Sequence, residues 1–162
     1  MLVKDIKDED IVNYKKTSMF IIFPNCSFKC DIENKCKLCQ NSELVKYPNI
    51  DIPVESVVKR YLANPLSHAI VCGGLESFDS WADLLNLVKE FRTVTCDDIV
   101  IYTGYYPDEI KGKIEELKSV VVDTNIIIKF GRFIPNKPHR FDEVLGVELS
   151  SDNQYAKRLE EC

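Results

Sequence analysis

Four of the chain's seven cysteines lie close together, at Cys26, Cys30, Cys36 and Cys39. The segment between them is rich in charged and amide side chains, so it would not bury four inert thiols. In a reducing compartment, clustered thiols are more often metal ligands than disulfide partners. Metal binding is therefore the chemistry that this spacing favours.

The spacing of the four cysteines favours an iron–sulfur cluster over zinc. Structural zinc sites usually use two well-separated pairs of ligands, whereas here five residues separate Cys30 from Cys36. Thiolates are the usual ligands of iron–sulfur clusters, and one short loop can wrap a cubane. A [4Fe–4S] cluster held by only three cysteines keeps one iron open to a small molecule. A compact four-cysteine zinc site remains the alternative.

Size and composition predict one domain over residues 1–162, with its core from about residue 18 to residue 157. The chain is 45% hydrophobic, which is enough for a core without disulfides. Its net charge is −5 and its basic residues are scattered, so we expect no nucleic-acid partner. We find no signal peptide and no apolar run near the roughly 20 residues of a membrane span. We therefore expect a cytoplasmic protein with no membrane partner.

Short β-branched segments alternate with segments of helical spacing. We expect strands at 18–23, 68–72, 98–103 and 125–130, a fifth strand at 143–149, helices at 54–62, 79–92 and 107–119, and a short closing helix at 153–161. The strands are too apolar to face water on either side. This pattern predicts an α/β fold with a mostly parallel sheet covered by helices.

Chemistry-bearing residues follow each of the first four expected strands. In α/β sheets, ligands bind beyond the carboxyl ends of the strands. The cysteine cluster follows the first strand, and the glycines that end or follow the next three are Gly73, Gly74, Gly104 and Gly131. We therefore expect all of these loops to meet at one edge of the sheet.

Six segments, in order, resemble the radical S-adenosylmethionine enzymes, and among them the activating proteins of anaerobic ribonucleotide reductases. They are PNCSFKC at 24–30, CQN at 39–41, GGLES at 73–77, IYTGY at 101–105, FGRF at 130–133 and SSDNQ at 150–154. The resemblance runs from about Ser18 to Lys157. It implies a partial, laterally open (β/α) barrel of the radical SAM type.

The resemblance implies that Cys26, Cys30 and Cys39 ligate a [4Fe–4S] cluster and that Cys36 is a spare thiol. In the common family pattern the third cysteine follows the second closely. Here an insertion places Cys39 nine positions after Cys30. Spacing alone keeps two other sets open, in which Cys36 joins Cys39 and either Cys30 or Cys26.

The resemblance also implies a pocket for S-adenosylmethionine. The residues expected there are Gly73, Gly74, Glu76, Thr103, Gly104, Tyr105, Lys129 and Asn153. Glycine lets the backbone approach a ligand closely, and Glu76 offers a carboxylate to the ammonium group of the cofactor. Lys129 sits in an apolar run, so its charge either faces the cofactor carboxylate or reaches solvent from the strand end. Asn153 and its neighbour Gln154 either line the site or cap a helix.

The implied activity is that of a radical SAM oxidoreductase. It cleaves S-adenosylmethionine reductively and removes hydrogen from a glycine of the large subunit of an anaerobic ribonucleotide reductase, which becomes a glycyl radical. The implied electron donor is of the flavodoxin or ferredoxin type. Two alternatives stay open, namely a radical SAM enzyme acting on another protein or a small molecule, and a non-catalytic iron–sulfur or zinc-binding module.

Overall fold

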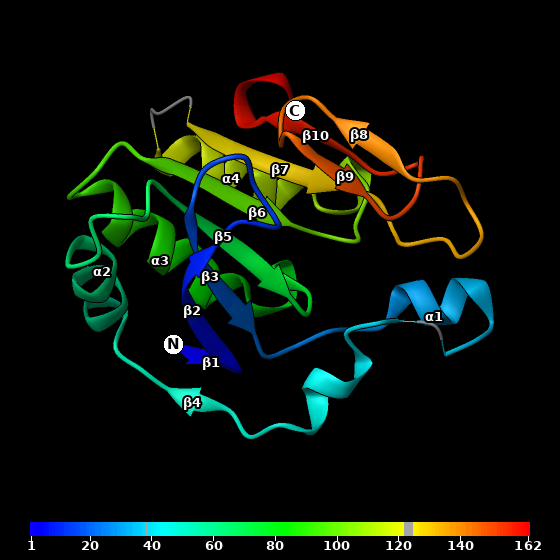
Figure 1. The fold of residues 1–162 in the computed structure, drawn as a ribbon, viewed down its shortest axis with the longest axis horizontal. Helices are drawn as coiled ribbons and strands as arrows, with labels where there is room; N and C mark the ends of the chain where they lie inside the picture. Colours follow the sequence, from blue (N-terminus) through cyan, green and yellow to red (C-terminus); the bar gives the residue numbers. More distant parts are fainter. Residues whose placement is uncertain (38, 122–124) are drawn as a thin grey trace.

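The computed structural model describes residues 1–37, 39–121 and 125–162, and a six-stranded sheet forms its centre (Figure 1). The strands lie in the order β10, β7, β6, β5, β3, β2. Their bounds are β2 Asp5–Asp10, β3 Ser18–Phe23, β5 Ala69–Gly74, β6 Asp98–Tyr102, β7 Ile126–Phe130 and β10 Tyr155–Arg158.

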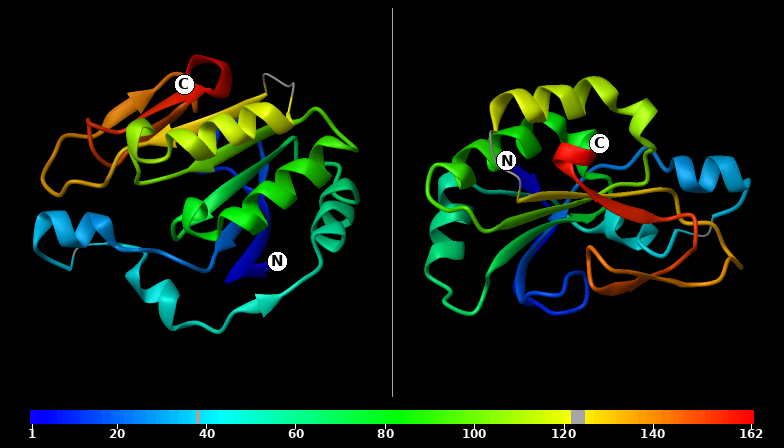
Figure 2. Two further views of the ribbon diagram at one scale, coloured as in Figure 1. Left: turned by 180° about the vertical axis from the view of Figure 1, so that it is seen from behind. Right: turned by 90° about the horizontal axis from the view of Figure 1, so that it is seen from above.

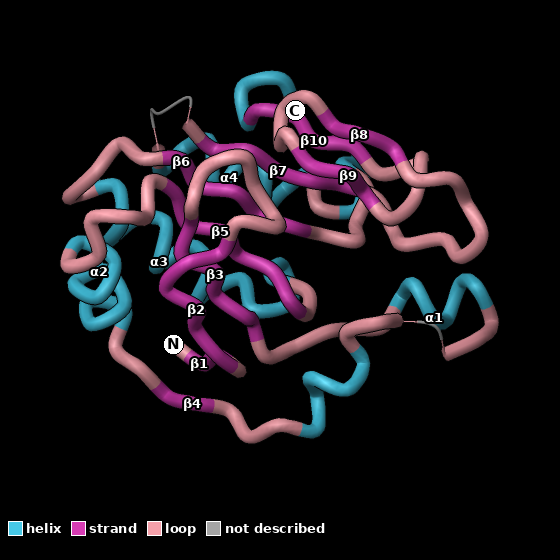
Figure 3. Tube along the Cα trace, in the orientation of Figure 1, coloured by secondary structure: helices cyan, strands magenta, loops and turns pink. Residues whose placement is uncertain are grey.

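Three helices cover one face of this sheet, and a hairpin lies against the other (Figure 2). The helices are α2 Val54–Leu62, α3 Trp81–Arg92 and α4 Lys111–Val120, and the hairpin strands are β8 Arg140–Asp142 and β9 Val147–Leu149. A short helix, α1 Lys29–Asn34, projects from the cysteine segment (Figure 3). The remaining elements are β1 Leu2–Val3 paired with β4 Ile50–Asp51, and the 3₁₀ turns η1 Ser42–Lys46, η2 Ser77–Ser80, η3 Pro107–Glu109 and η4 Leu159–Glu161.

The four central strands, β3, β5, β6 and β7, are parallel. The outer strands β2 and β10 join them antiparallel. Among the residues described, the sheet ends at β2 and β10 and does not close on itself. The expected α/β architecture with a mostly parallel sheet is thus present.

The period of two along each strand divides the sheet into two environments. In β3, Met19, Ile21 and Phe23 lie in the core under the helices. The alternate residues Phe20 and Ile22 face the side without helices, where they line a cavity. A strand that is buried on one face and lines a cavity on the other needs apolar residues throughout, which explains the uninterrupted sequence SMFIIF.

The helices bury the faces that their spacing predicts. In α2 the buried residues recur at steps of three and four, from Val54 through Val57 and Val58 to Tyr61. The predicted bounds of β3 and α2 are confirmed to the residue. The strands expected at 68–72, 98–103 and 125–130 are confirmed within one or two residues at each end.

The closing helix expected at 153–161 is wrong. Tyr155–Arg158 forms strand β10, which pairs with β7 and ends in a single 3₁₀ turn. The Tyr155 ring packs 5.7 Å from the ring of Phe130, centroid to centroid. Pairing with the otherwise open edge of β7 satisfies backbone groups that a short polar helix could not satisfy there, so the tertiary contact overrides local propensity.

The fifth strand expected at 143–149 is wrong in its extent and its place. Only Val147–Leu149 is a strand, and it pairs with β8 outside the main sheet. Leu145 and Leu149 are buried against the helix-free face of the sheet with Val71, Val100 and Ile127. The apolar residues of this segment therefore cover the sheet instead of extending it.

In the part of the chain that the structure describes, no helix is both long and apolar enough to cross a lipid bilayer.

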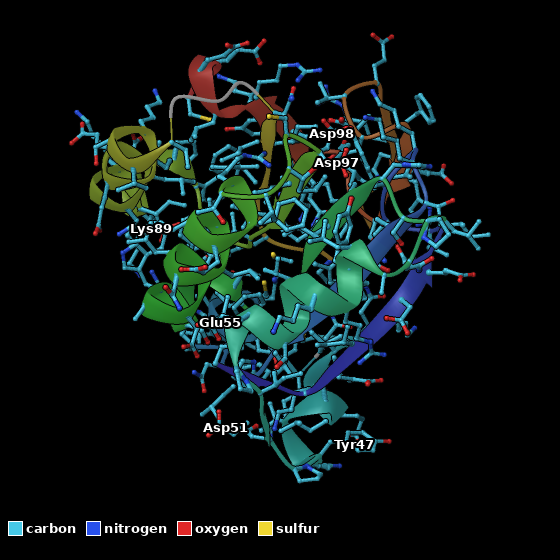
Figure 4. The ribbon with its side chains drawn as sticks, turned by 90° about the vertical axis from the view of Figure 1, so that its left-hand side faces the viewer. Tyr47, Asp51, Glu55, Lys89, Asp97 and Asp98 are labelled. Carbon is cyan, nitrogen blue, oxygen red and sulfur yellow. The ribbon has the colours of Figure 1, made fainter. Side chains whose placement is uncertain are left out.

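A substitution within α3 tests this packing. Leu84 is fully buried under the sheet, so Leu84→Ala is expected to lower the free energy of unfolding by about 2–5 kcal/mol. Lys89 lies on the exposed face of the same helix (Figure 4), and Lys89→Ala is expected to stay within about 0.5 kcal/mol of the parent. Urea unfolding followed by circular dichroism measures both. Equal effects of the two substitutions would contradict this orientation of the helix.

Candidate cluster and cofactor site

A cavity of about 540 Å³ opens on the helix-free face of the sheet, at the carboxyl ends of the central strands. Its walls come from β3, β5, β6 and β7, from the cysteine segment and from β9. Cys26, Cys30 and Cys39 all line it, whereas Cys36, which is also described, does not. The structure therefore gathers the three cysteines that the resemblance implies as ligands and leaves the fourth outside.

Helix α1 accommodates the residues between Cys30 and Cys39, so that both cysteines line the cavity despite their long separation in the sequence. The chain turns at both ends of α1 through left-handed residues, Phe28 (φ 52°) and Lys35 (φ 53°). Cys30 lies within the helix and is partly buried. Cys36 lies just beyond it, where its exposed Sγ donates to the carbonyl of Asn34 at 3.0 Å.

Hydrogen bonds tie the cysteine segment to the sheet edge. The Asp79 carboxylate accepts from the amide of Ser27 at 2.6 Å and from the hydroxyl of Tyr105 at 2.6 Å. The Asn41 side chain donates to the carbonyl of Gly74 at 2.8 Å. Both ends of the segment are thus fixed to loops that follow strands β5 and β6.

Arg132 forms a second and more buried attachment. Its guanidinium, 3% exposed, donates to both carboxylate oxygens of Glu109 at 2.8 and 2.6 Å and lies 3.0 Å from the carboxylate of Glu33 in α1. Lys29, also in α1, lies 2.9 Å from Glu109. These four side chains form a charge network that holds the helix carrying Cys30 against the loop after β6.

The three cavity cysteines are neutral thiols in the absence of a metal. Burial raises the pKa of Cys26 to about 12, and it also raises the pKa of Cys30 and of Cys39. A cation that binds the sulfur atoms displaces these protons, so binding is coupled to proton release.

Glu76 is buried beside the cavity and joins two loops. One carboxylate oxygen accepts from the amide of Phe78 at 3.1 Å and the hydroxyl of Thr103 at 2.8 Å, and the other accepts from the amide of Gly104 at 2.8 Å. Burial raises its pKa to about 7, although these hydrogen bonds act in the opposite direction. Glu76 therefore positions the walls, and its charge favours a cationic group in the cavity.

Lys129 points into the cavity from β7 and does not reach solvent. Its ammonium group donates to the carbonyl of Gly131 at 3.0 Å and lies 5.8 Å from the ring centroid of Tyr102. Burial lowers its pKa to about 8, against the attraction of Glu76. A buried cation with one backbone acceptor is a binding partner for an anion.

The other predicted residues divide between the cavity wall and its support. Gly74, Thr103 and Gly104 line the cavity, while Gly73, Tyr105 and Asn153 do not. At Gly74 (φ 84°) a side chain is excluded, because a Cβ would lie 2.5 Å from Ile22. Tyr105 lines a smaller neighbouring pocket with Cys26 and Cys30.

Asn153 supports the loop after β7, because its amide donates to the carbonyl of Arg132 at 2.8 Å. Its side-chain oxygen is buried without a hydrogen-bond partner. The neighbouring Gln154, the other amide of the expected pair, does line the cavity and donates to the carbonyl of Gly131 at 3.2 Å. The polar character of the segment was visible in the sequence, but which amide faces the cavity was not.

Sequence reasoning also missed the charge network and the wall formed by β9. Arg132 lies in the segment FGRF, and its partners Glu33 and Glu109 are separated from it by 99 and 23 positions. Charge pairs between residues so far apart in the sequence do not follow the period of any helix or strand, so the sequence pattern does not reveal them.

No three His, Cys, Asp or Glu side chains of the described ranges converge on a point where one metal ion could bind. The three cysteines instead surround a cavity, which suits a cubane because each thiolate binds a different iron atom. Three partly buried thiols around this volume fit a [4Fe–4S] cluster.

Comparison with known proteins identifies the family of the chain. A family model described as a 4Fe-4S single cluster domain matches residues 17–155, a range that includes all four clustered cysteines and every residue of the cavity wall except Lys7, Val12 and Asn13. No curated protein matches significantly. No solved structure matches either.

Removing one charge of the Arg132 network is expected to change the acid stability of the protein. Arg132 holds the pKa of Glu109 at about 2, below its ordinary value of 4.5. A lowered folded-state pKa means that stability is gained as pH rises from about 2 to about 4.5 and lost as it falls through that range. Glu109→Gln should lower the free energy of unfolding at pH 7 by about 1–3 kcal/mol. It should also weaken the acid limb, which is the fall of the free energy of unfolding as pH decreases from about 4.5 to about 2.

Urea titrations between about pH 2.5 and pH 7 measure both effects. The matched control is Glu43→Gln, because the Glu43–Lys46 pair is mostly exposed and such pairs contribute less than about 1 kcal/mol. An acid limb as steep in Glu109→Gln as in the parent would show that Glu109 is not stabilised by Arg132.

Proposed function

Because the chain belongs to the family of 4Fe-4S single cluster domains, we propose that it is a radical S-adenosylmethionine enzyme that activates an anaerobic ribonucleotide reductase. In this proposal Cys26, Cys30 and Cys39 hold the cluster, and S-adenosylmethionine binds beside it in the same cavity. The observation that carries the proposal is the joint presence of these three cysteines, Lys129 and Glu76 around one cavity of about 540 Å³.

The choice of ligands rests on which thiols can reach a common centre. Cys26, Cys30 and Cys39 are partly buried around the cavity, whereas Cys36 is exposed and lies outside it. Either alternative set would require Cys36 to turn inward and one cavity cysteine to turn away. Three ligands leave one iron without a protein ligand, as expected for a site that binds a small molecule.

The polar groups of the cavity complement the methionine end of S-adenosylmethionine. The carboxylate of the cofactor pairs with Lys129, which is otherwise a buried cation with a single backbone acceptor. Its ammonium and sulfonium charges are favoured by the buried carboxylate of Glu76. Gly73 and Gly74 let the backbone of β5 approach, with the carbonyl of Gly74 fixed by Asn41.

The loop after β6 lies beside the cysteines, and we assign it to the nucleoside half. Thr103 and Gly104 are oriented by their hydrogen bonds to Glu76. Tyr105 is oriented by its hydroxyl, which donates to Asp79. Asn153 acts through the loop after β7, because its amide holds the carbonyl of Arg132.

When bound, a reduced cluster with an open iron supplies one electron for cleavage of the sulfonium cofactor. The chain's own residues bind and orient the cofactor and exclude water with the apolar side chains of Phe20, Ile22 and Phe133 in the wall. The electron donor in the proposal is a flavodoxin or ferredoxin, and the reaction takes place in the cytoplasm.

The proposed substrate is a glycine in the large subunit of the reductase. The segments IYTGY, FGRF and SSDNQ, which resemble the activating proteins, all lie at the cavity. The β2–β3 loop and β9 both contribute residues to the cavity wall, and in the proposal the segment of the partner protein enters beside them.

Four single Cys→Ala variants test the ligand assignment. After anaerobic reconstitution, Cys26→Ala, Cys30→Ala and Cys39→Ala are expected to lose most bound iron and the visible absorption band of the cluster. Cys36→Ala is the matched control, because it removes a thiol of the same segment that lies outside the cavity, and it should retain both. Loss of the cluster in Cys36→Ala with retention in Cys30→Ala would overturn the assignment.

Two measurements on the reconstituted protein test the activity. With dithionite and S-adenosylmethionine we expect a change in the EPR spectrum of the reduced cluster and release of 5′-deoxyadenosine. Adding a candidate reductase without oxygen should then produce a glycyl-radical EPR signal. Absence of both the spectral change and the product would refute the radical proposal. Product without the glycyl signal would refute only the substrate.

A further inference from the structure

Strand β9 faces the cavity with its edge. Four consecutive residues, Val147, Glu148, Leu149 and Ser150, all line the cavity. Successive side chains of a strand point to opposite faces, so a strand that faced the cavity with one of its faces would contribute only every second residue. An unbroken run shows that the backbone edge of β9 forms this wall.

This edge has free hydrogen-bonding groups. β9 belongs to a two-stranded sheet and, in the described part of the chain, pairs only with β8. In an antiparallel pair, the N–H and C=O groups of every second residue point away from the partner strand. On β9 these are the groups with which a strand bound beside it can pair.

Both edges of the main sheet are covered by side chains instead. On β2 the carbonyl of Asp8 accepts from Ser67 at 2.6 Å and from Asn64 at 3.1 Å. On β10 the amide of Ala156 donates to the carboxylate of Asp142 at 2.9 Å. Since proteins usually protect edges in this way, an unprotected edge beside a functional cavity indicates a binding surface.

The β2–β3 loop, whose Lys15 amide donates to the carbonyl of Leu145 before β9 at 2.9 Å, also lines the cavity and suits the side chains of a bound strand. Val12, in the loop between β2 and β3, lines the cavity and is 71% exposed. Lys7 and Asn13 line the same wall. The neighbouring Ile11 is 77% exposed but does not line the cavity.

We propose that the free edge of β9 binds an extended, glycine-containing segment of the partner protein as an added β-strand, and thereby brings that glycine to the cysteine end of the cavity. This inference rests on the proposed function, since it concerns how the same site holds its protein substrate. A glycine has no side chain by which to be recognised, so its position must be set by its backbone and its neighbours. Strand addition does this through main-chain hydrogen bonds, and pockets for alternate side chains add selectivity.

Hydrogen–deuterium exchange on the reconstituted protein tests the docking mode. The probe is a capped peptide of about nine residues in which threonine and valine alternate around a central glycine. We expect amide exchange in the segment 147–150 to slow at least tenfold at saturating peptide, with unchanged exchange in α2. No binding of the peptide at millimolar concentration, or binding without protection of this segment, would overturn the proposal.

Peptide N-methylation separates backbone pairing from side-chain contact. Methylating the amides on one edge of the peptide should weaken binding at least tenfold, and methylating those on the other edge should leave it unchanged. Equal binding of the two methylated series would show that no strand is added.

A matched pair of protein variants tests whether the peptide binds at the cavity. Val12→Asp is expected to weaken peptide binding severalfold, because Val12 lines the cavity, whereas Ile11→Asp should bind the peptide as the parent does. Both positions are exposed, so both variants should fold. Equal effects of the two substitutions would place the peptide elsewhere.

The outcomes for this inference and for the proposed function are separable. Cleavage of S-adenosylmethionine without protection of β9 would overturn strand addition and leave the enzyme proposal standing. Protection of β9 without any cleavage would support a peptide-binding edge and refute the radical chemistry.

Discussion

The position of the cysteine segment depends on one buried guanidinium. Arg132 is almost fully removed from solvent, and its charge must therefore be matched within the protein. The match comes from two other parts of the chain, Glu109 after β6 and Glu33 in α1. Because a buried arginine cannot give up its proton, this attachment persists at any pH at which the two carboxylates are ionised. The helix that carries Cys30 is thus fixed to the sheet by electrostatics, although α1 has no buried residue of its own.

The sheet gives the site its second constraint, which is the separation of an apolar face from a polar one. Along β7, Ile126, Ile128 and Phe130 pack under the helices, and Lys129 falls on the opposite face. A single-residue shift in register would exchange these positions and put the ammonium group into the core. The charges of Lys129 and Glu76 are tolerated because both lie at the cavity, where each offsets part of the burial cost of the other and a zwitterionic ligand can pair with both.

These two constraints explain how much the sequence could predict. Strong local patterns, such as SMFIIF in β3 and the apolar stripe of α2, specified elements to the residue, and the strand-end rule placed Cys26, Gly74 and Gly131 near one another. Segments whose conformation depends on a distant partner were not predictable. Tyr155–Arg158 is a strand because β7 has an open edge. Val147–Leu149 pairs with β8 in a hairpin because Leu145 and Leu149 cover the sheet. The network of Arg132 likewise joins residues that no local period connects.

The insertion in the cysteine segment does not keep Cys39 from the cavity that Cys26 and Cys30 also line. Two left-handed residues, each costing about 1–2 kcal/mol, bound α1 at Phe28 and Lys35. They turn the chain outward and then back, so that the amide of Cys39 reaches the carboxylate of Asp31 at 2.9 Å. The added residues are taken up by a projecting helix and not by a wider cavity. Cys36 falls at the outer turn of this excursion for that reason, which leaves its thiol outside the cavity that Cys26, Cys30 and Cys39 line.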